Sequence, residues 1–94
     1  MKVELSAPAL LELDNVLGYI ASHNPSAVGK VRAVIFLALQ RVSRFPEAAQ
    51  RVAERPNIRR LPLVRYPYAL YYEVDTEVIT VVRILHTSRG PWIK

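Results

Sequence analysis

The sequence predicts an α+β fold in which a helical hairpin packs on a small antiparallel sheet, in the order β-α-α-β-β-β. Three observations carry this prediction. Apolar residues recur every three or four positions through residues 9–45, which is the spacing of amphipathic helices. After residue 57 the spacing changes to two, which is typical of strands. The chain has only 94 residues, so it can build one small core, and we expect a single domain over residues 1–94.

The first strand and the first helix follow from residues 1–22. Residues 1–5 alternate in character and predict a brief edge strand. Ser6 or Ala7 then offers an N-cap, and Pro8 suits a first helical turn. The helix is expected over about residues 9–22, with an apolar stripe of Leu10, Leu13, Leu17 and Ile20.

The second helix is expected to follow after a short turn, so that the two helices pack as an antiparallel hairpin. Asn24 is a good N-cap residue and Pro25 a good first helical residue. The helix is expected to end at Phe45, because Pro46 disfavours helical geometry at the residue before it. Its apolar stripe is predicted to be Val28, Val31, Ile35, Ala38, Leu39, Val42 and Phe45.

The sheet half of the chain begins after a polar connector over residues 46–57, which is expected to hold at most one helical turn. Residues 58–64, 69–74 and 78–86 are rich in β-branched, Leu and Tyr residues and predict a three-stranded meander. If residues 75–77 form the last turn, one face of the sheet lies under the helices and carries Leu70, Tyr72, Val74, Val78, Val82 and Ile84. The other face then carries Ala69, Tyr71, Glu73, Ile79, Val81, Arg83 and Leu85, and it is apolar enough to require a cover.

The charge balance indicates an anionic partner. Thirteen Lys+Arg against eight Asp+Glu give a net charge of +5 and a pI near 10.0. Ten of the thirteen cations are arginine, which suits bidentate contacts to phosphate or carboxylate. Carboxylates early in the chain interrupt any signal peptide or membrane span, so we expect a cytoplasmic protein with no membrane partner.

Composition also excludes several kinds of site. The absence of cysteine rules out disulfides, thiolate metal sites and cysteine nucleophiles. The three glycines are scattered rather than gathered in a phosphate-binding loop. No pair of metal ligands occurs at helical spacing, so we expect no metal and no cofactor.

Two segments nevertheless carry functional groups. Arginine beside tyrosine suits nucleic acid, because a guanidinium binds phosphate while a ring stacks on a base. The candidate target-binding or nucleic-acid-binding residues are Arg59, Arg60, Arg65, Tyr68 and Arg89. The simpler alternative is a solvated strand edge whose tyrosine rings, those of Tyr68 and Tyr72, pack into the core.

The second segment ends the last strand. A metal-independent endonuclease needs cations to hold the scissile phosphate and a group that transfers a proton. The candidate catalytic residues are Arg60, Arg83, His86 and Arg89. In the alternative interpretation, His86 makes a structural hydrogen bond and Trp92 anchors the chain end.

The chain resembles the RelE/ParE superfamily of bacterial toxins, the toxic halves of type II toxin–antitoxin modules. The resemblance covers nearly the whole chain and is closest to the ParE-like and plasmid-stabilisation branch. It rests on Phe45-Pro46-Glu47, Arg59-Arg60-Leu61, Tyr66-Pro67-Tyr68-Ala69-Leu70-Tyr71-Tyr72-Glu73-Val74 and Arg83-Ile84-Leu85-His86-Thr87-Ser88-Arg89.

The resemblance implies one of two targets. RelE-like members are ribosome-dependent messenger-RNA endoribonucleases, whereas ParE-like members trap the cleaved complex of DNA gyrase and are not themselves enzymes. Here no tyrosine follows Tyr72, and Ala69 stands where a ribonuclease member tends to carry a cation. We therefore favour a ParE-like inhibitor of growth, with a RelE-like ribonuclease as the alternative.

Either branch implies a cognate antitoxin, an acidic and partly disordered chain that forms a hetero-oligomer with the toxin. We expect it to cover the sheet face bearing Tyr71, Val81 and Arg83, or else the groove between the helical hairpin and the sheet. Two other interpretations stay open: a non-toxic basic domain that binds nucleic acid, and a structural homodimer whose sheet faces pair.

Overall fold

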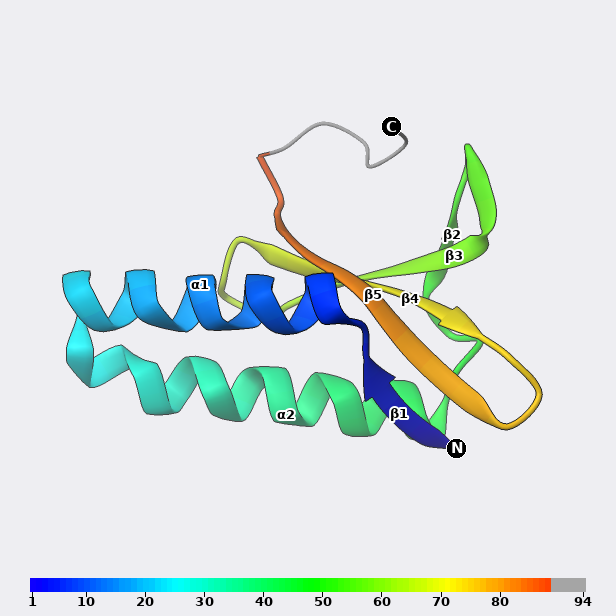
Figure 1. The fold of residues 1–94 in the computed structure, drawn as a ribbon, viewed down its shortest axis with the longest axis horizontal. Coiled ribbons are helices and arrows are strands. Elements are labelled where there is room, and N and C mark those ends of the chain that lie inside the picture. Colours follow the sequence, from blue (N-terminus) through cyan, green and yellow to red (C-terminus); the bar gives the residue numbers. More distant parts are fainter. Residues whose placement is uncertain (89–94) are drawn as a thin grey trace.

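A computed structural model describes residues 1–88 and has the predicted α+β architecture (Figure 1). The helical hairpin packs against a five-stranded sheet of order β1-β5-β4-β3-β2. In chain order the elements are β1 (Lys2–Leu5), α1 (Ala7–His23), the 3-10 turn η1 (Pro25–Ala27), α2 (Val28–Arg44), β2 (Gln50–Val52), β3 (Arg55–Pro62), β4 (Tyr68–Val74) and β5 (Val78–His86).

The hairpin follows the local signals in the sequence with small adjustments. The Ser6 hydroxyl caps α1 by accepting a hydrogen bond from the Ala9 amide, at 3.2 Å. Asn24 does not cap α2 with its side chain, because Pro25 opens a 3-10 turn and the Ser26 hydroxyl donates to Asn24 Oδ1. α2 ends at Arg44, one residue before the predicted end, and Phe45 is its C-cap.

The sheet contains two features beyond the predicted meander. β1 is an edge strand, as expected, but it pairs in parallel with β5, so the sheet is mixed. β2 forms inside the segment expected to be a connector and pairs with β3 through Gln50↔Arg60 and Arg51↔Arg59. This short polar strand shows no apolar periodicity. It forms through its pairing with β3, and it does not need to bury one face.

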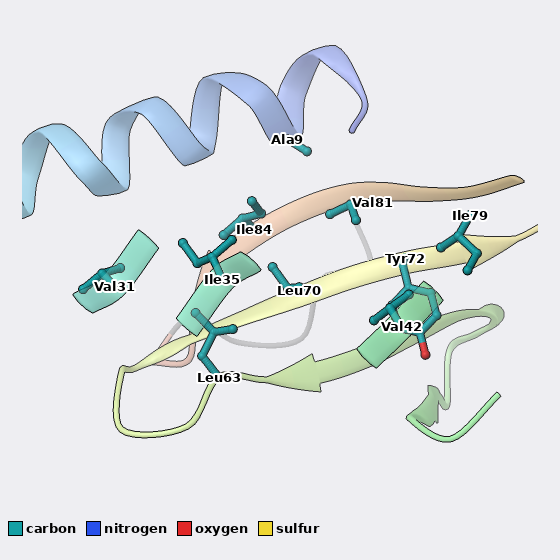
Figure 2. Packing of buried hydrophobic residues seen from close by; sticks show 10 residues of the cluster. All are labelled: Ala9, Val31, Ile35, Val42, Leu63, Leu70, Tyr72, Ile79, Val81 and Ile84. Atoms are coloured by element: carbon teal, nitrogen blue, oxygen red, sulfur yellow. The ribbon is translucent and has the colours of Figure 1, made fainter. Parts of the chain in front are cut away.

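The main core lies between the hairpin and one face of the sheet (Figure 2). Tyr72 is its largest fully buried side chain. Two residues of the predicted helical stripes, Leu10 and Phe45, are instead exposed. The buried core residues are Ala9, Val31, Ile35, Val42, Leu63, Leu70, Tyr72, Ile79, Val81 and Ile84.

The predicted face assignment of β5 is wrong in its first half and correct in its second. Val74 pairs with Ile79, so Ile79 and Val81 lie under the helices, not on the opposite face. A bulge then follows: Tyr72 pairs with Val81 and Tyr71 with Arg83, which leaves Val82 as the extra residue. After the bulge the residues of β5 face the sides that the sequence predicted, with Ile84 in the main core and Leu85 on the opposite face.

Candidate functional site

Among the proposed nuclease groups of residues 1–88, Arg60 and Arg83 flank Tyr71 on one sheet face, whereas His86 pairs with Tyr68 on the helix side. Arg60 lies on the sheet face away from the helices, where its Nε donates to the Tyr71 hydroxyl at 3.1 Å and its guanidinium carbon lies 5.9 Å from the ring centre. Arg83 instead contacts α1, and His86 ends β5. The fourth candidate, Arg89, lies outside the described residues.

Arg83 is bound to a carboxylate of α1. Its Nη2 and Nε lie 2.6 and 2.8 Å from Glu12 Oε2, and the pair is largely shielded from solvent. The other oxygen, Oε1, accepts the Ile84 backbone N–H at 2.8 Å. Because β1 pairs with β5 only as far as Val81, this carboxylate occupies a β5 edge that has no further strand partner. The Arg83 guanidinium is therefore engaged in the fold.

Ser6 makes hydrogen bonds to the neighbouring part of the same β5 edge. Its backbone N–H donates to the Val81 carbonyl at 2.9 Å, and its hydroxyl donates to the Val82 carbonyl at 3.0 Å. Ser6 and Glu12 together satisfy the β5 backbone beside the bulge.

Arg59 lies on the helix side of the sheet, opposite to Arg60, because it pairs with the buried Tyr72. Its Nη1 donates to the carbonyls of Glu47 and Ala49, at 2.9 and 2.7 Å. Nearby, the Tyr72 hydroxyl donates to the Pro46 carbonyl at 2.8 Å. Burial raises the pKa of Tyr72 above its ordinary value of 10.0, and the Arg59 charge opposes part of that rise. These two residues hold the segment that follows α2.

His86 is held locally, which agrees with its structural interpretation. Its Nδ1 accepts the Ser88 backbone N–H at 3.1 Å. Its ring also meets the ring of Tyr68 edge-on, with centroids 5.2 Å apart. Tyr68 is half-buried beside the main core, whereas Arg65 is exposed in the β3–β4 loop and has a positive φ of 74°.

The sheet face away from the helices is less open than the sequence suggests. Ile58, Ala69, Tyr71 and Leu85 form a second small core there, with Val52 and Val82 packed against it. Of the residues predicted to receive an antitoxin, Tyr71 lies on this face and is buried. Val81 does not lie there, because it is fully buried under the helices.

Exposed apolar surface gathers instead in a groove beside α2, which we name the hairpin groove. Its volume is about 1110 Å³. Among its lining residues Leu37, Phe45 and Val64 are 62%, 58% and 71% exposed. Arg41, Arg44 and Arg65 add positive charge, and no carboxylate of residues 1–88 lines the groove.

The sequence held one signal for this groove that the stripe prediction did not use. Leu37 is a large apolar residue that falls off the α2 stripe, as does its neighbour Phe36, and both are exposed. Val64, placed in a strand by its periodicity, lies beyond the end of β3. Only the folded chain brings it opposite α2.

Two classes of site are missing from the described part of the chain. Within residues 1–88 no three His, Asp or Glu side chains gather closely enough to hold a metal ion. In the same residues no helix is both long enough and apolar enough to span a bilayer.

Comparisons with known proteins agree with this architecture. A family model described as "ParE toxin of type II toxin-antitoxin system, parDE" matches residues 3–91. The chain is 30% identical over 83 residues to Y4kP, a proposed toxin of Sinorhizobium fredii, covering 86% of this chain and 85% of that protein.

A solved structure, described as "Chromosomal ParDE TA system from P. aeruginosa", has the same fold. It superposes with a TM-score of 0.81 at 22% identity over 94% of this chain and 97% of that one. Because the family model spans nearly the whole sequence, this chain belongs to the ParE toxin family of type II toxin–antitoxin systems.

Proposed function

We propose that this chain inhibits bacterial growth by poisoning DNA gyrase in the cytoplasm, and that a cognate antitoxin neutralises it by lying in the hairpin groove. The observation that carries the proposal is the groove itself, which combines exposed apolar side chains with three arginines. Exposed apolar side chains gathered beside like charges are typical of an interaction site.

The chemistry of the groove favours an acidic amphipathic segment. Leu37, Phe45 and Val64 offer apolar contacts, while the guanidinium groups of Arg41 and Arg44 can pair with carboxylates. An amphipathic helix laid into such a groove buries its apolar face and keeps its acidic residues at the rim. The similar P. aeruginosa protein, which is part of a ParDE system, supports an antitoxin partner.

The separation of His86 from the two arginines supports gyrase over messenger RNA as the target. Proton transfer to a scissile phosphate needs a group within hydrogen-bond reach of it, with cations beside it. Arg60 and Arg83 flank Tyr71 on the sheet face away from the helices, whereas His86 pairs with Tyr68 on the helix side. With Arg83 held by a carboxylate, this set is poorly arranged to stabilise a phosphorane-like transition state.

Inducible expression in a bacterium tests the proposal. We expect growth arrest, rescued when the small acidic protein encoded beside this chain is expressed with it. Purified protein should inhibit supercoiling by gyrase and increase its cleaved DNA complex, and it should leave messages on translating ribosomes intact. Message cleavage without gyrase inhibition would replace this proposal with the RelE-like alternative, and harmless expression would refute the toxin function of this copy.

A pair of variants on one helix tests the antitoxin site. Leu37→Asp puts a carboxylate into the groove and should weaken antitoxin binding in titration calorimetry. Phe36→Asp is the matched control, since Phe36 is equally exposed on α2 and does not line the groove. Equal affinities of the two variants would place the antitoxin elsewhere, with the sheet face of Tyr71 and Arg83 as the next candidate.

A further inference from the structure

A second cleft lies on the other side of the β3–β4 loop from the hairpin groove, and we name it the aromatic cleft. Its volume is about 570 Å³, within the range of small-ligand sites. Its lining comes from the last turns of α1, the end of η1, the first turn of α2, the loop that leads into β4, and the facing ends of β4 and β5. The lining residues that carry rings or polar groups are Tyr19, His23, Asn24, Tyr66, Tyr68 and His86.

The rings form two pairs that come from different parts of the fold. On the α1 side, Tyr19 and His23 are stacked, with centroids 4.1 Å apart and planes at 28°. On the sheet side, Tyr68 and His86 meet edge-on at 5.2 Å. Tyr19 and His86 are exposed, so flat ring surface is available to a ligand.

Hydrogen bonds set which nitrogen of each neutral histidine carries the proton. His23 Nδ1 lies 2.9 Å from the Tyr19 carbonyl, which only accepts, so Nδ1 donates and Nε2 is left as an acceptor. His86 Nδ1 accepts the Ser88 N–H, so Nε2 carries the proton and donates. The cleft therefore combines ring faces with one unused donor and one unused acceptor among the described contacts.

We propose that the aromatic cleft stacks an unpaired base of single-stranded DNA. A base has a flat π face for the rings and donors and acceptors along its edge, whereas an apolar side chain would leave the two histidine Nε2 atoms and the Asn24 amide nitrogen unmatched. The lining of the cleft includes no carboxylate among residues 1–88, and the chain carries a net charge of +5.

Arg65, which lines the adjacent hairpin groove, is the cation that we expect to bind a phosphate of the strand. Arg65 directly precedes Tyr66 and is exposed, and its positive φ of 74° turns the chain between groove and cleft. The choice of DNA over RNA rests on the proposed function, because gyrase acts on DNA. The base-binding chemistry does not depend on that choice.

Fluorescence anisotropy with a labelled twelve-nucleotide oligo(dT) and the purified full chain tests the proposal. We expect saturable binding that is much weaker for a strand of twelve abasic sites, which has the same phosphates and no bases. Tyr19→Ala should weaken oligo(dT) binding by about 5- to 150-fold, the loss expected for one stacked base. His86→Ala should weaken it in the same direction.

Phe36→Ala is the matched control, because Phe36 is 60% exposed against 59% for Tyr19 and lines neither cavity. It should bind oligo(dT) as the unaltered chain does, and thermal melting should show all three variants folded. The assignment of the cleft as a base-binding site would be overturned if the abasic strand bound as tightly as oligo(dT). It would also be overturned if Tyr19→Ala and Phe36→Ala lost equal affinity for oligo(dT). Tighter binding of oligo(U) than of oligo(dT) would overturn the choice of DNA.

The same preparations separate this inference from the proposed function. If gyrase is poisoned but oligo(dT) does not bind, only the cleft assignment fails. If oligo(dT) binds through Tyr19 but gyrase is unaffected, the cleft is a base-binding site and the proposal of gyrase as the target is wrong. An aromatic peptide should not displace oligo(dT) from Tyr19, and one that binds there more tightly than oligo(dT) would assign the cleft to a protein partner instead.

Discussion

Glu12 shows how one side chain can decide the role of another. Its carboxylate accepts from both the Arg83 guanidinium and the Ile84 backbone, at the edge of β5 that β1 leaves uncovered. The sequence marks Arg83 as a candidate catalytic cation, because nothing in the spacing links it to a residue on α1. The contact spans 71 positions and depends on where the bulge turns β5.

We expect Glu12→Gln and Arg83→Gln each to lower the free energy of unfolding by about 1–3 kcal/mol, the usual range for a charge-assisted hydrogen bond that is largely shielded from water. Urea unfolding measures this loss. The double variant should lose less than the sum of the single losses, because the two residues are in direct contact.

Glu4→Gln is the control for this pair. Glu4 forms an ion pair with Lys2, but both side chains are more than half exposed, at 52% and 73%. Its loss should stay within about 0.5 kcal/mol. Additive losses for Glu12 and Arg83 would mean that the contact contributes little to stability.

Tyr72 makes stability depend on pH in the alkaline range. Burial raises its pKa in the folded chain above 10.0, so the unfolded chain loses the phenol proton first as pH rises. The contribution of Tyr72 is therefore complete below pH 10 and is lost as pH rises through the raised folded pKa. Tyr72→Phe should flatten this part of the urea-unfolding profile and cost about 1 kcal/mol at neutral pH through the lost bond to Pro46.

At the scale of elements, local patterns predicted the helices and the meander well. The Ser6 cap, the helix end before Pro46 and strand β5 over residues 78–86 all follow from short stretches of sequence. β2 could not be predicted in this way, since Gln50 and Arg51 form a strand only through pairing with β3. The bulge at Val82 was equally hidden, because Val81 and Val82 are each suited to either face.

The contacts of the candidate site residues could not be predicted from the sequence, for a physical reason. Arg59, Arg60 and Arg83 were selected for their charge, yet each guanidinium contacts a partner far along the chain. The apolar residues of the hairpin groove, such as Leu37 and Val64, carry no chemistry that marks them in the sequence. Their exposure is a property of the assembled hairpin and sheet.

Ser6 links two elements, and its removal should destabilise both. Ser6→Ala loses the N-cap of α1 and the hydrogen bond to the Val82 carbonyl beside the bulge. We expect a loss of about 1–2 kcal/mol in urea unfolding. Ser22→Ala, which removes an exposed hydroxyl bonded only to neighbouring residues, is the control and should change stability by about 0.5 kcal/mol or less. Equal losses would show that the Ser6 contacts add nothing beyond those of a surface serine.

At the scale of the whole molecule, the β3–β4 loop divides two binding surfaces. Residues up to Arg65 line the hairpin groove, and residues from Tyr66 onward line the aromatic cleft. The helical hairpin is divided at the same level, with Ala27 of η1 and Val31 of α2 in the cleft and Val34 of α2 in the groove. An antitoxin in the groove would therefore lie beside any DNA strand in the cleft, and both would approach Arg65.

This shared position predicts competition. A saturating amount of antitoxin should weaken oligo(dT) binding, because acidic residues at the groove rim would repel phosphates and occupy Arg65. Arg65→Asn should weaken the binding of both antitoxin and oligo(dT). Asn is the chosen replacement because it tolerates the positive φ at this position. In a salt titration it should reduce the slope of log K against log salt by about 0.7, the value for one lost contact to a single strand.

Arg32→Gln is the control for this prediction, because Arg32 is an exposed α2 cation that lines neither cavity. It should leave the salt slope and the antitoxin affinity unchanged. If antitoxin and oligo(dT) bind together without mutual effect, the two surfaces work independently, and neutralisation must then act on a contact with gyrase rather than on the DNA strand.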